Sequence, residues 1–164
     1  MFKGKKGFTL IEMLVVIGVI GILAAGLLAA IDPMEQLKKG RDTRKRSLAV
    51  EVVNATTRYY ATRGTMPWAS GGDPSESVLS GLSAIITNLV TMGELKSDFA
   101  ATVALGGIGD AIFVTGSYTA ATVVACFDPE SKSISLDPTT VFTKAGVINT
   151  ASCPALIGCY WCAK

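Results

Sequence analysis

One apolar run near the N-terminus constrains this chain most. No charged side chain occurs between Met13 and Ile31, and the apolar stretch counted from Phe8 is about 24 residues long. At 1.5 Å per residue, a helix of that length measures about 36 Å, enough to cross a bilayer with some tilt. The apolar core of a secretory signal peptide is shorter, about 7 to 15 residues. Small residues at 24–26 leave cleavage by an ordinary signal peptidase as the alternative.

A single carboxylate, Glu12, lies near the start of this run. A charge at mid-bilayer costs about 3 kcal/mol on insertion scales and less near the interface, so such residues are rare and usually functional. A buried carboxylate needs a partner or takes up a proton. The alternative is a side chain that reaches back to interfacial water.

The segment around Glu12 carries a family resemblance. The hexapeptide Gly7-Phe8-Thr9-Leu10-Ile11-Glu12 follows a short basic leader and precedes the apolar helix. This order resembles the processing site of type IV pilins and pseudopilins. The resemblance implies a leader 1–7, cleavage between Gly7 and Phe8 by a prepilin peptidase, and N-methylation of Phe8. The amine released at Phe8 of one subunit would then pair with Glu12 of another and fix their axial stagger.

Small residues gather on one broad face of the predicted membrane helix, 8–31. They are Gly18, Gly21, Ala25 and Ala29. Small residues let helices approach closely in lipid, which favours a surface for packing many copies into a filament core. The alternative is that glycine and alanine are simply common in membrane spans.

The distribution of charge conflicts with the orientation that the resemblance implies. Three lysines precede the apolar helix, whereas six basic residues follow it between Lys38 and Arg46, so the positive-inside rule alone would place the C-terminal side in the cytoplasm. The resemblance instead implies a single-pass inner-membrane protein with a cytoplasmic N-terminus. An inner-membrane assembly platform would then move it into an extracellular or periplasmic filament. We follow the resemblance, because the cysteines also suit an oxidising compartment.

Beyond the span, Asp32-Pro33 predicts either a kink or a second helix that Asp32 caps. The predicted amphipathic helix 32–63 ends near Gly64, and its core-facing stripe recurs at helical spacing. That stripe comprises Leu48, Val52, Ala55, Thr56 and Tyr59. The basic run Lys38–Arg46 is expected to be mainly a solvated face, with lipid headgroups or acidic patches on adjacent subunits as the functional alternative.

The predicted head, 64–164, is a helix on a small antiparallel sheet, so the fold class is α+β and pilin-like. The pattern predicts a helix from Ser75 to about Met92 and strands at 111–114 and 118–127 with a turn at Gly116-Ser117. Ile134 with Leu136, and the dipeptide 141–142, predict two further short strands.

Four cysteines lie in the last quarter of the chain: Cys126, Cys153, Cys159 and Cys162. An even number outside the cytoplasm predicts two disulfides, and three pairings are allowed. The C-x-x-C at 159–162 has no following helix to stabilise a thiolate, and Cys126 has no near partner for a zinc site, so neither redox chemistry nor metal binding is favoured.

Composition argues against catalysis and nucleic-acid binding. The chain has no histidine, which excludes histidine bases and ligands, and its net charge is only +2. Aspartates scattered through loops show no calcium-binding spacing, and no cofactor is expected. The sequence therefore predicts a structural subunit of a type IV pilus-like filament and not an enzyme. The alternatives are a pseudopilin of a type II secretion system and a membrane-anchored binding domain that never polymerises.

Overall fold

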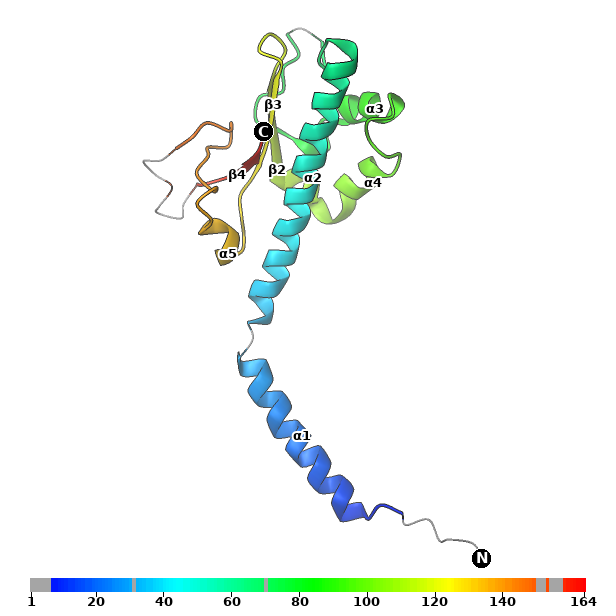
Figure 1. Ribbon diagram of the computed structural model, residues 1–164, viewed down its shortest axis with the longest axis vertical. Helices are drawn as coiled ribbons and strands as arrows, with labels where there is room; N and C mark the ends of the chain where they lie inside the picture. The colour runs from blue at the N-terminus through cyan, green and yellow to red at the C-terminus, as the bar shows by residue number, and fades with distance from the viewer. Residues whose placement is uncertain (1–6, 31, 70, 150–152, 154–157) are drawn as a thin grey trace, which may run out of the picture. The chain divides into compact units, whose positions relative to one another are not determined.

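A computed structural model of the chain describes residues 7–30, 32–69, 71–149, 153 and 158–164. The chain divides into two compact units, Met1–Gln36 and Leu37–Lys164. The first unit contains helix α1, Leu10–Ala30, and the first turn of helix α2, Pro33–Arg63. The rest of α2 belongs to the second unit and runs through the head (Figure 1).

The ends of α2 follow from local chemistry. Oδ1 of Asp32 accepts the backbone N–H groups of Met34 and Glu35 at 3.1 and 3.2 Å, and Pro33 occupies the first helical position. This confirms a new capped helix rather than a kinked one. At the other end, the N–H of Gly64 donates to the carbonyl of Tyr60 at 2.8 Å with a φ of 69°, so the predicted glycine cap is also confirmed.

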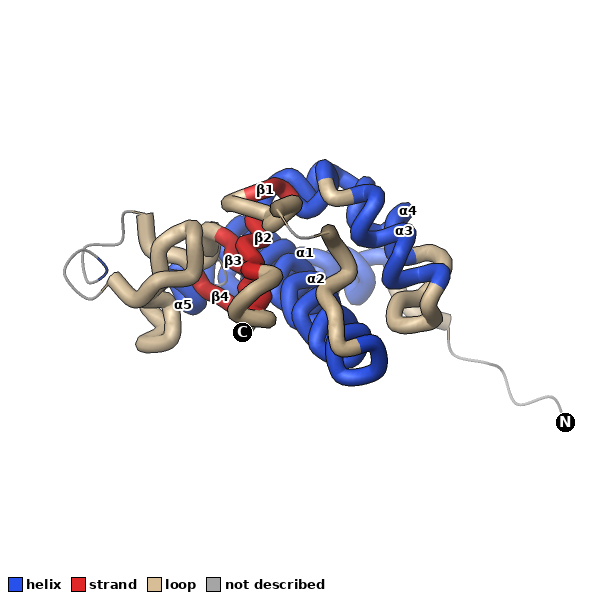
Figure 2. Tube along the Cα trace, turned by 90° about the horizontal axis from the view of Figure 1, so that it is seen from above, coloured by secondary structure: helices blue, strands red, loops and turns tan. Residues whose placement is uncertain are grey.

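The head contains a four-stranded antiparallel sheet in the order β1-β2-β3-β4, which confirms the α+β class (Figure 2). Strand β1 is Ser77–Val78, β2 is Ile112–Ser117, β3 is Thr122–Phe127 and β4 is Trp161–Ala163. Register places Phe113 opposite Cys126, and Cys126 opposite Cys162. Strand β3 therefore pairs with β2 on one side and with β4, at the C-terminal end of the chain, on the other.

Shorter helical segments complete the head. Helix α3 is Ser83–Thr91 and helix α4 is Phe99–Ala104, and both lie beside α2 (Figure 1). Helix α5, Lys132–Ser135, follows β3. Two 3₁₀ segments, η1 at Leu79–Gly81 and η2 at Leu105–Ala111, flank α3 and α4.

The core forms between α2 and the sheet. All five residues of the predicted stripe on α2, Leu48 to Tyr59, are buried as expected. From the sheet, Ile112, Ala125 and Phe127 are fully buried. At about 25 cal/mol per Å² of apolar area, burial of this kind is the main term that holds α2 to the sheet.

The predicted helix from Ser75 to Met92 is wrong in its first half. Ser77 and Val78 instead pair with Val114 and Phe113 at the sheet edge, and α3 begins only at Ser83. Glu76 has a φ of 47°, which is incompatible with a continuous helix. The predicted stop is correct, because Gly93 has a φ of 78°.

The turn predicted at Gly116-Ser117 is also wrong, because both residues lie within β2. The Trp68 ring packs so closely on Gly116 that a Cβ there would lie 2.6 Å from it, so the glycine permits packing rather than a turn. The chain instead reverses before β3, next to Ala121, which has a φ of 51°.

Two further strands were predicted wrongly or only in part. Ile134 lies in helix α5 and Leu136 caps it, because the N–H groups after Ser131 find carbonyl partners within this short turn. Phe142 forms isolated bridges with Ile148 and Tyr160 and no full strand. The sequence analysis missed β4, which is only three residues long.

Candidate functional site

The carboxylate of Glu12 caps the start of α1. Its Oε2 accepts the backbone N–H of Thr9 at 2.8 Å and the Thr9 hydroxyl at 2.7 Å. The Thr9 hydroxyl oxygen in turn accepts the N–H of Glu12 at 3.3 Å. This is a capping box, and the Thr-x-x-Glu spacing that signals it was overlooked in the sequence. In the uncut chain, Glu12 therefore has a partner on its own helix.

Helix α1 exposes its apolar side chains along its length. The segment Leu10–Leu28 is long and apolar enough to cross a membrane, and none of its most apolar stretch is buried. No atom outside the helix lies within 4 Å of the position that a Cβ would take at Gly18 or Gly21. Ala25 is exposed as well, whereas the side chain of Ala29 lies outside the described set. Among the described residues, Gly18, Gly21 and Ala25 are thus open to contact with another molecule.

The cysteines divide into two pairs at the C-terminal end. Cys126 and Cys162 form a disulfide directly across β3 and β4, at a sequence separation of 36. The two cysteines of the C-x-x-C are therefore not bonded to each other. Cys153 and Cys159 are both buried, and burial together with a hydrogen bond to Cys153 raises the pKa of the Cys159 thiol to about 11.

Comparison with known proteins points to the N-terminal segment. Residues 2–28 match the family model for the prokaryotic N-terminal methylation motif. The chain is 32% identical over 99 residues to the type IV major pilin protein PilE1 of Neisseria gonorrhoeae, which covers 57% of this chain and 45% of the relative. It is also 32% identical over 100 residues to the fimbrial protein EcpC of Eikenella corrodens, covering 57% and 64%.

The chain is thus similar to a type IV pilin and a fimbrial protein over 57% of its length. It spans about half to two thirds of the length of the curated relatives that it matches. No solved structure matches it. Both relatives are named as pilin or fimbrial proteins and neither as an enzyme.

In the head, part of the basic run is buried, contrary to the expectation of a solvated face. Asp42 is fully buried and accepts the N–H groups of Glu130, at 3.0 Å to each oxygen, and of Ser131, at 2.7 Å. Lys45, which is 5% exposed, lies 2.6 Å from Glu130 and 3.7 Å from Asp42. These side chains bind the loop after β3 to α2, and their spacing in phase with the buried stripe could have revealed them.

Glu130 is the acidic centre of this charge cluster. Its Oε2 accepts two hydrogen bonds from Arg41, at 2.9 and 2.6 Å, and its Oε1 accepts one from Lys45. These hydrogen bonds, first from Arg41 and then from Lys45, lower the pKa of Glu130 to about 2. Nearby, the Arg46 guanidinium lies 4.6 Å from the centre of the Trp161 ring, a cation–π contact with β4.

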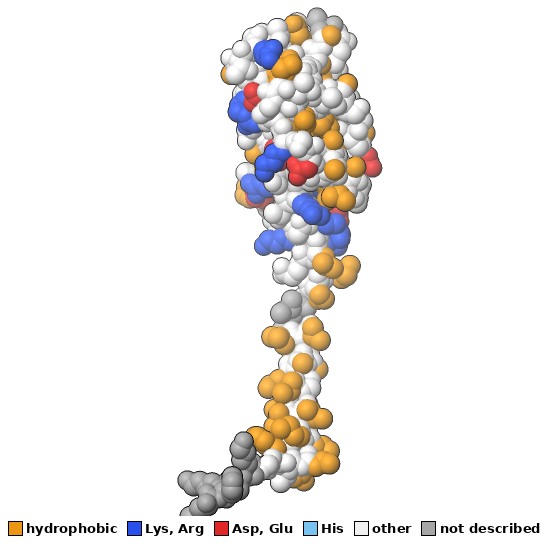
Figure 3. Space-filling model, turned by 90° about the vertical axis from the view of Figure 1, so that its right-hand side faces the viewer, with side chains coloured by type: hydrophobic (Ala, Val, Ile, Leu, Met, Phe, Trp, Pro, Cys, Tyr) orange, Lys and Arg blue, Asp and Glu red, His pale blue; other side chains and the backbone are white. Residues whose placement is uncertain are grey.

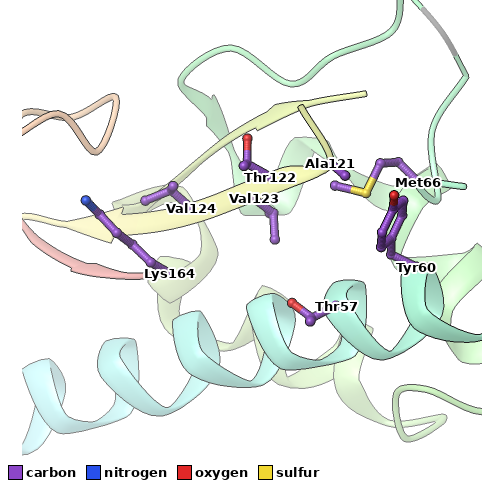
Figure 4. A pocket seen from close by; sticks show the side chains of 8 residues that line it. All are labelled: Thr57, Tyr60, Met66, Ala121, Thr122, Val123, Val124 and Lys164. Carbon is purple, nitrogen blue, oxygen red and sulfur yellow. The ribbon is translucent and has the colours of Figure 1, made fainter. Parts of the chain in front are cut away.

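A groove of about 280 Å³ opens between the C-terminal half of α2 and the start of β3 (Figure 4). Its lining residues are Thr57, Tyr60, Met66, Ala121, Thr122, Val123, Val124 and Lys164. Lys164 is the only charged side chain among them, so the lining offers no acid–base pair for catalysis. Within the described part of the chain, no three potential metal ligands come together either.

Proposed function

We propose that this chain is a structural subunit of a type IV pilus-like filament. It would be made as a precursor, cleaved between Gly7 and Phe8, N-methylated at Phe8 and assembled through α1. Maturation would involve a prepilin peptidase, and assembly an inner-membrane platform. The observation that carries this proposal is an apolar helix whose most apolar stretch is not buried by any described residue, within a methylation motif that contains a single carboxylate.

The chemistry of α1 supports assembly through this helix. Its apolar surface must be covered either by lipid or by other helices, because water exposure is unfavourable. Gly18 and Gly21 allow close helix–helix approach. Cleavage would add an α-amine, cationic at neutral pH, at Phe8, four residues before Glu12 and next to Thr9. Glu12 would then have a charged donor on a neighbouring copy in addition to Thr9.

Two substitutions separate charge pairing from helix capping. Glu12→Gln keeps a hydrogen-bond acceptor at the cap but removes the charge, whereas Thr9→Val removes the capping hydroxyl and keeps the carboxylate. Pairing with a neighbouring amine predicts that Glu12→Gln abolishes or strongly reduces filaments, seen by electron microscopy of sheared cell surfaces, while the protein stays in the membrane. Thr9→Val should assemble much better than Glu12→Gln.

Filaments at the normal level in Glu12→Gln would contradict the pairing role. If filaments are absent even for the unaltered chain, the membrane-anchored binding domain becomes the better account. A pseudopilin of a type II secretion system would share the dependence on Glu12. It would be distinguished by loss of protein export, and not of surface filaments, when the gene is deleted.

A further inference from the structure

Positive charge is concentrated at one end of the head. Between Lys38 and Arg46 the sequence has six basic residues and one acidic residue, whereas residues 47–164 have six basic and nine acidic residues. Figure 3 shows Lys and Arg side chains gathered over this N-terminal part of α2 in the head. The head is therefore electrically polarised, although the whole chain carries a net charge of only +2.

Some of these cations already have partners inside the head. Arg41 and Lys45 bind Glu130, and Arg46 stacks on Trp161. Lys39 and Arg44 are exposed, and Lys38 is half-buried. No acidic partner is found for these three among the residues that the structure describes. They form what we call the basic collar: Lys38, Lys39 and Arg44.

The position of the collar in the chain limits what it can meet. Lys38 follows Leu28, the last residue of the predicted span, by ten residues. Even a fully extended chain of that length spans only about 36 Å, and helical residues shorten it considerably. When α1 is in a bilayer, the collar must therefore lie near the membrane surface from which the chain emerges. Phosphate groups of anionic lipids attract such juxtamembrane cations, and the attraction falls off within about 8 Å at physiological salt.

We propose that the basic collar binds anionic phospholipid headgroups while the subunit is held in the membrane before assembly. The acidic remainder of the head is repelled by the same surface, so the polarity orients the head with α2 toward the bilayer. The interaction needs only that α1 is inserted in a membrane, and it holds for either orientation of the chain. It also gives a role to basic residues that the positive-inside rule would otherwise disfavour on the exported side.

The test uses the full-length chain in lipid nanodiscs that hold one copy each. Discs of phosphatidylcholine are compared with discs containing one quarter phosphatidylglycerol, and hydrogen–deuterium exchange of residues 34–46 is followed by mass spectrometry. Anionic lipid should slow exchange of this segment at least threefold, and about 0.5 M salt should remove the difference by screening. Exchange of β2 and β3 should not depend on the lipid.

Charge-matched variants identify the residues. Lys38→Gln/Lys39→Gln leaves Arg44 in the collar and should reduce the lipid-dependent slowing at least by half, whereas Lys96→Gln/Lys164→Gln, which removes two exposed lysines elsewhere on the head, should leave it intact. Equal exchange in both lipids would overturn the proposal, as would a lipid effect that the first substitution leaves unchanged. Slowing that appears only in discs with two or more copies would also overturn it, because the partner would then be another subunit.

Discussion

At the scale of single residues, a few charged side chains bind the C-terminal part of the head to α2. Asp42 supplies both carboxylate oxygens to backbone N–H groups of Glu130 and Ser131, and it does so without solvent exposure. A buried carboxylate that is fully hydrogen-bonded is tolerated, but its removal leaves the N–H groups of Glu130 and Ser131 without this acceptor and the buried cation Lys45 with Glu130 alone. The structural role of the basic run thus depends on the acidic residue within it.

Asp42→Ala should therefore destabilise the protein by about 3 kcal/mol, in the range measured when one partner of a buried pair is removed. Urea unfolding of the detergent-solubilised chain, followed by tryptophan fluorescence, measures this loss. Asp98→Ala is the matched control, because Asp98 is exposed and makes no side-chain cap at the start of α4. A loss below about 1 kcal/mol for Asp42→Ala would show that the cluster does not hold the loop.

The lowered pKa of Glu130 predicts that the free energy of unfolding depends on pH in a definite direction. Its pKa is about 2 in the folded protein against 4.5 as the ordinary value, so its stabilisation is present above about 4.5 and is lost as the pH falls toward 2. Since 37% of the side chain is exposed, solvent screening reduces the expected contribution to about 1 kcal/mol. Burial raises the pKa of Asp128, which works in the opposite direction.

The difference in unfolding free energy between the unaltered protein and Glu130→Gln isolates this contribution from that of Asp128. The difference should be about 1 kcal/mol at pH 7 and should shrink toward zero by about pH 2. Denaturant titrations at several pH values measure it. A difference that stays constant over this range would mean that the Arg41 and Lys45 contacts do not depend on the charge of Glu130.

At the scale of elements, periodicity and caps predicted the long helices well. The stripe from Leu48 to Tyr59, the Asp32 cap and the Gly64 stop are all local features, and they lie within α2 or directly at its two ends as expected. Strand β4 was missed because three residues carry too little pattern, and the sheet pairing that defines it is nonlocal. Gly116 was misassigned because the close approach of Trp68 is a tertiary contact.

Like the Asp42 cluster, the disulfide between β3 and β4 holds the C-terminal part of the head in place, but it does so through a covalent bond. With a sequence separation of 36 between the cysteines, the chain-entropy model gives about 4 kcal/mol of stabilisation. Cys126→Ser/Cys162→Ser should lower the free energy of unfolding by that order under non-reducing conditions. Addition of reductant should lower the free energy of unfolding of the unaltered protein by a similar amount. It should remove no β3–β4 stabilisation from the variant, which already lacks this disulfide. Equal stability of the two proteins without reductant would contradict this role.

At the scale of the whole molecule, the two units differ in how they are stabilised. The head, Leu37–Lys164, has its own core and covalent bridge, whereas the segment Leu10–Leu28 buries none of its most apolar stretch. The second unit is therefore expected to fold by itself, and the first requires lipid or other copies of the helix. In the proposed function, lipid covers this helix while the subunit is held in the membrane. Other copies of the helix cover it after assembly into the filament.

The intact mass of the mature chain tests the account most directly. Protein purified from cells, without reduction, should have the mass of residues 8–164 plus one methyl group. It should also lack the two thiol hydrogens of the Cys126–Cys162 bridge, and four in all if Cys153 and Cys159 form the second disulfide that the even number of cysteines predicts. A chain that starts at any residue other than Phe8, or one without the methyl group, would contradict the proposed maturation.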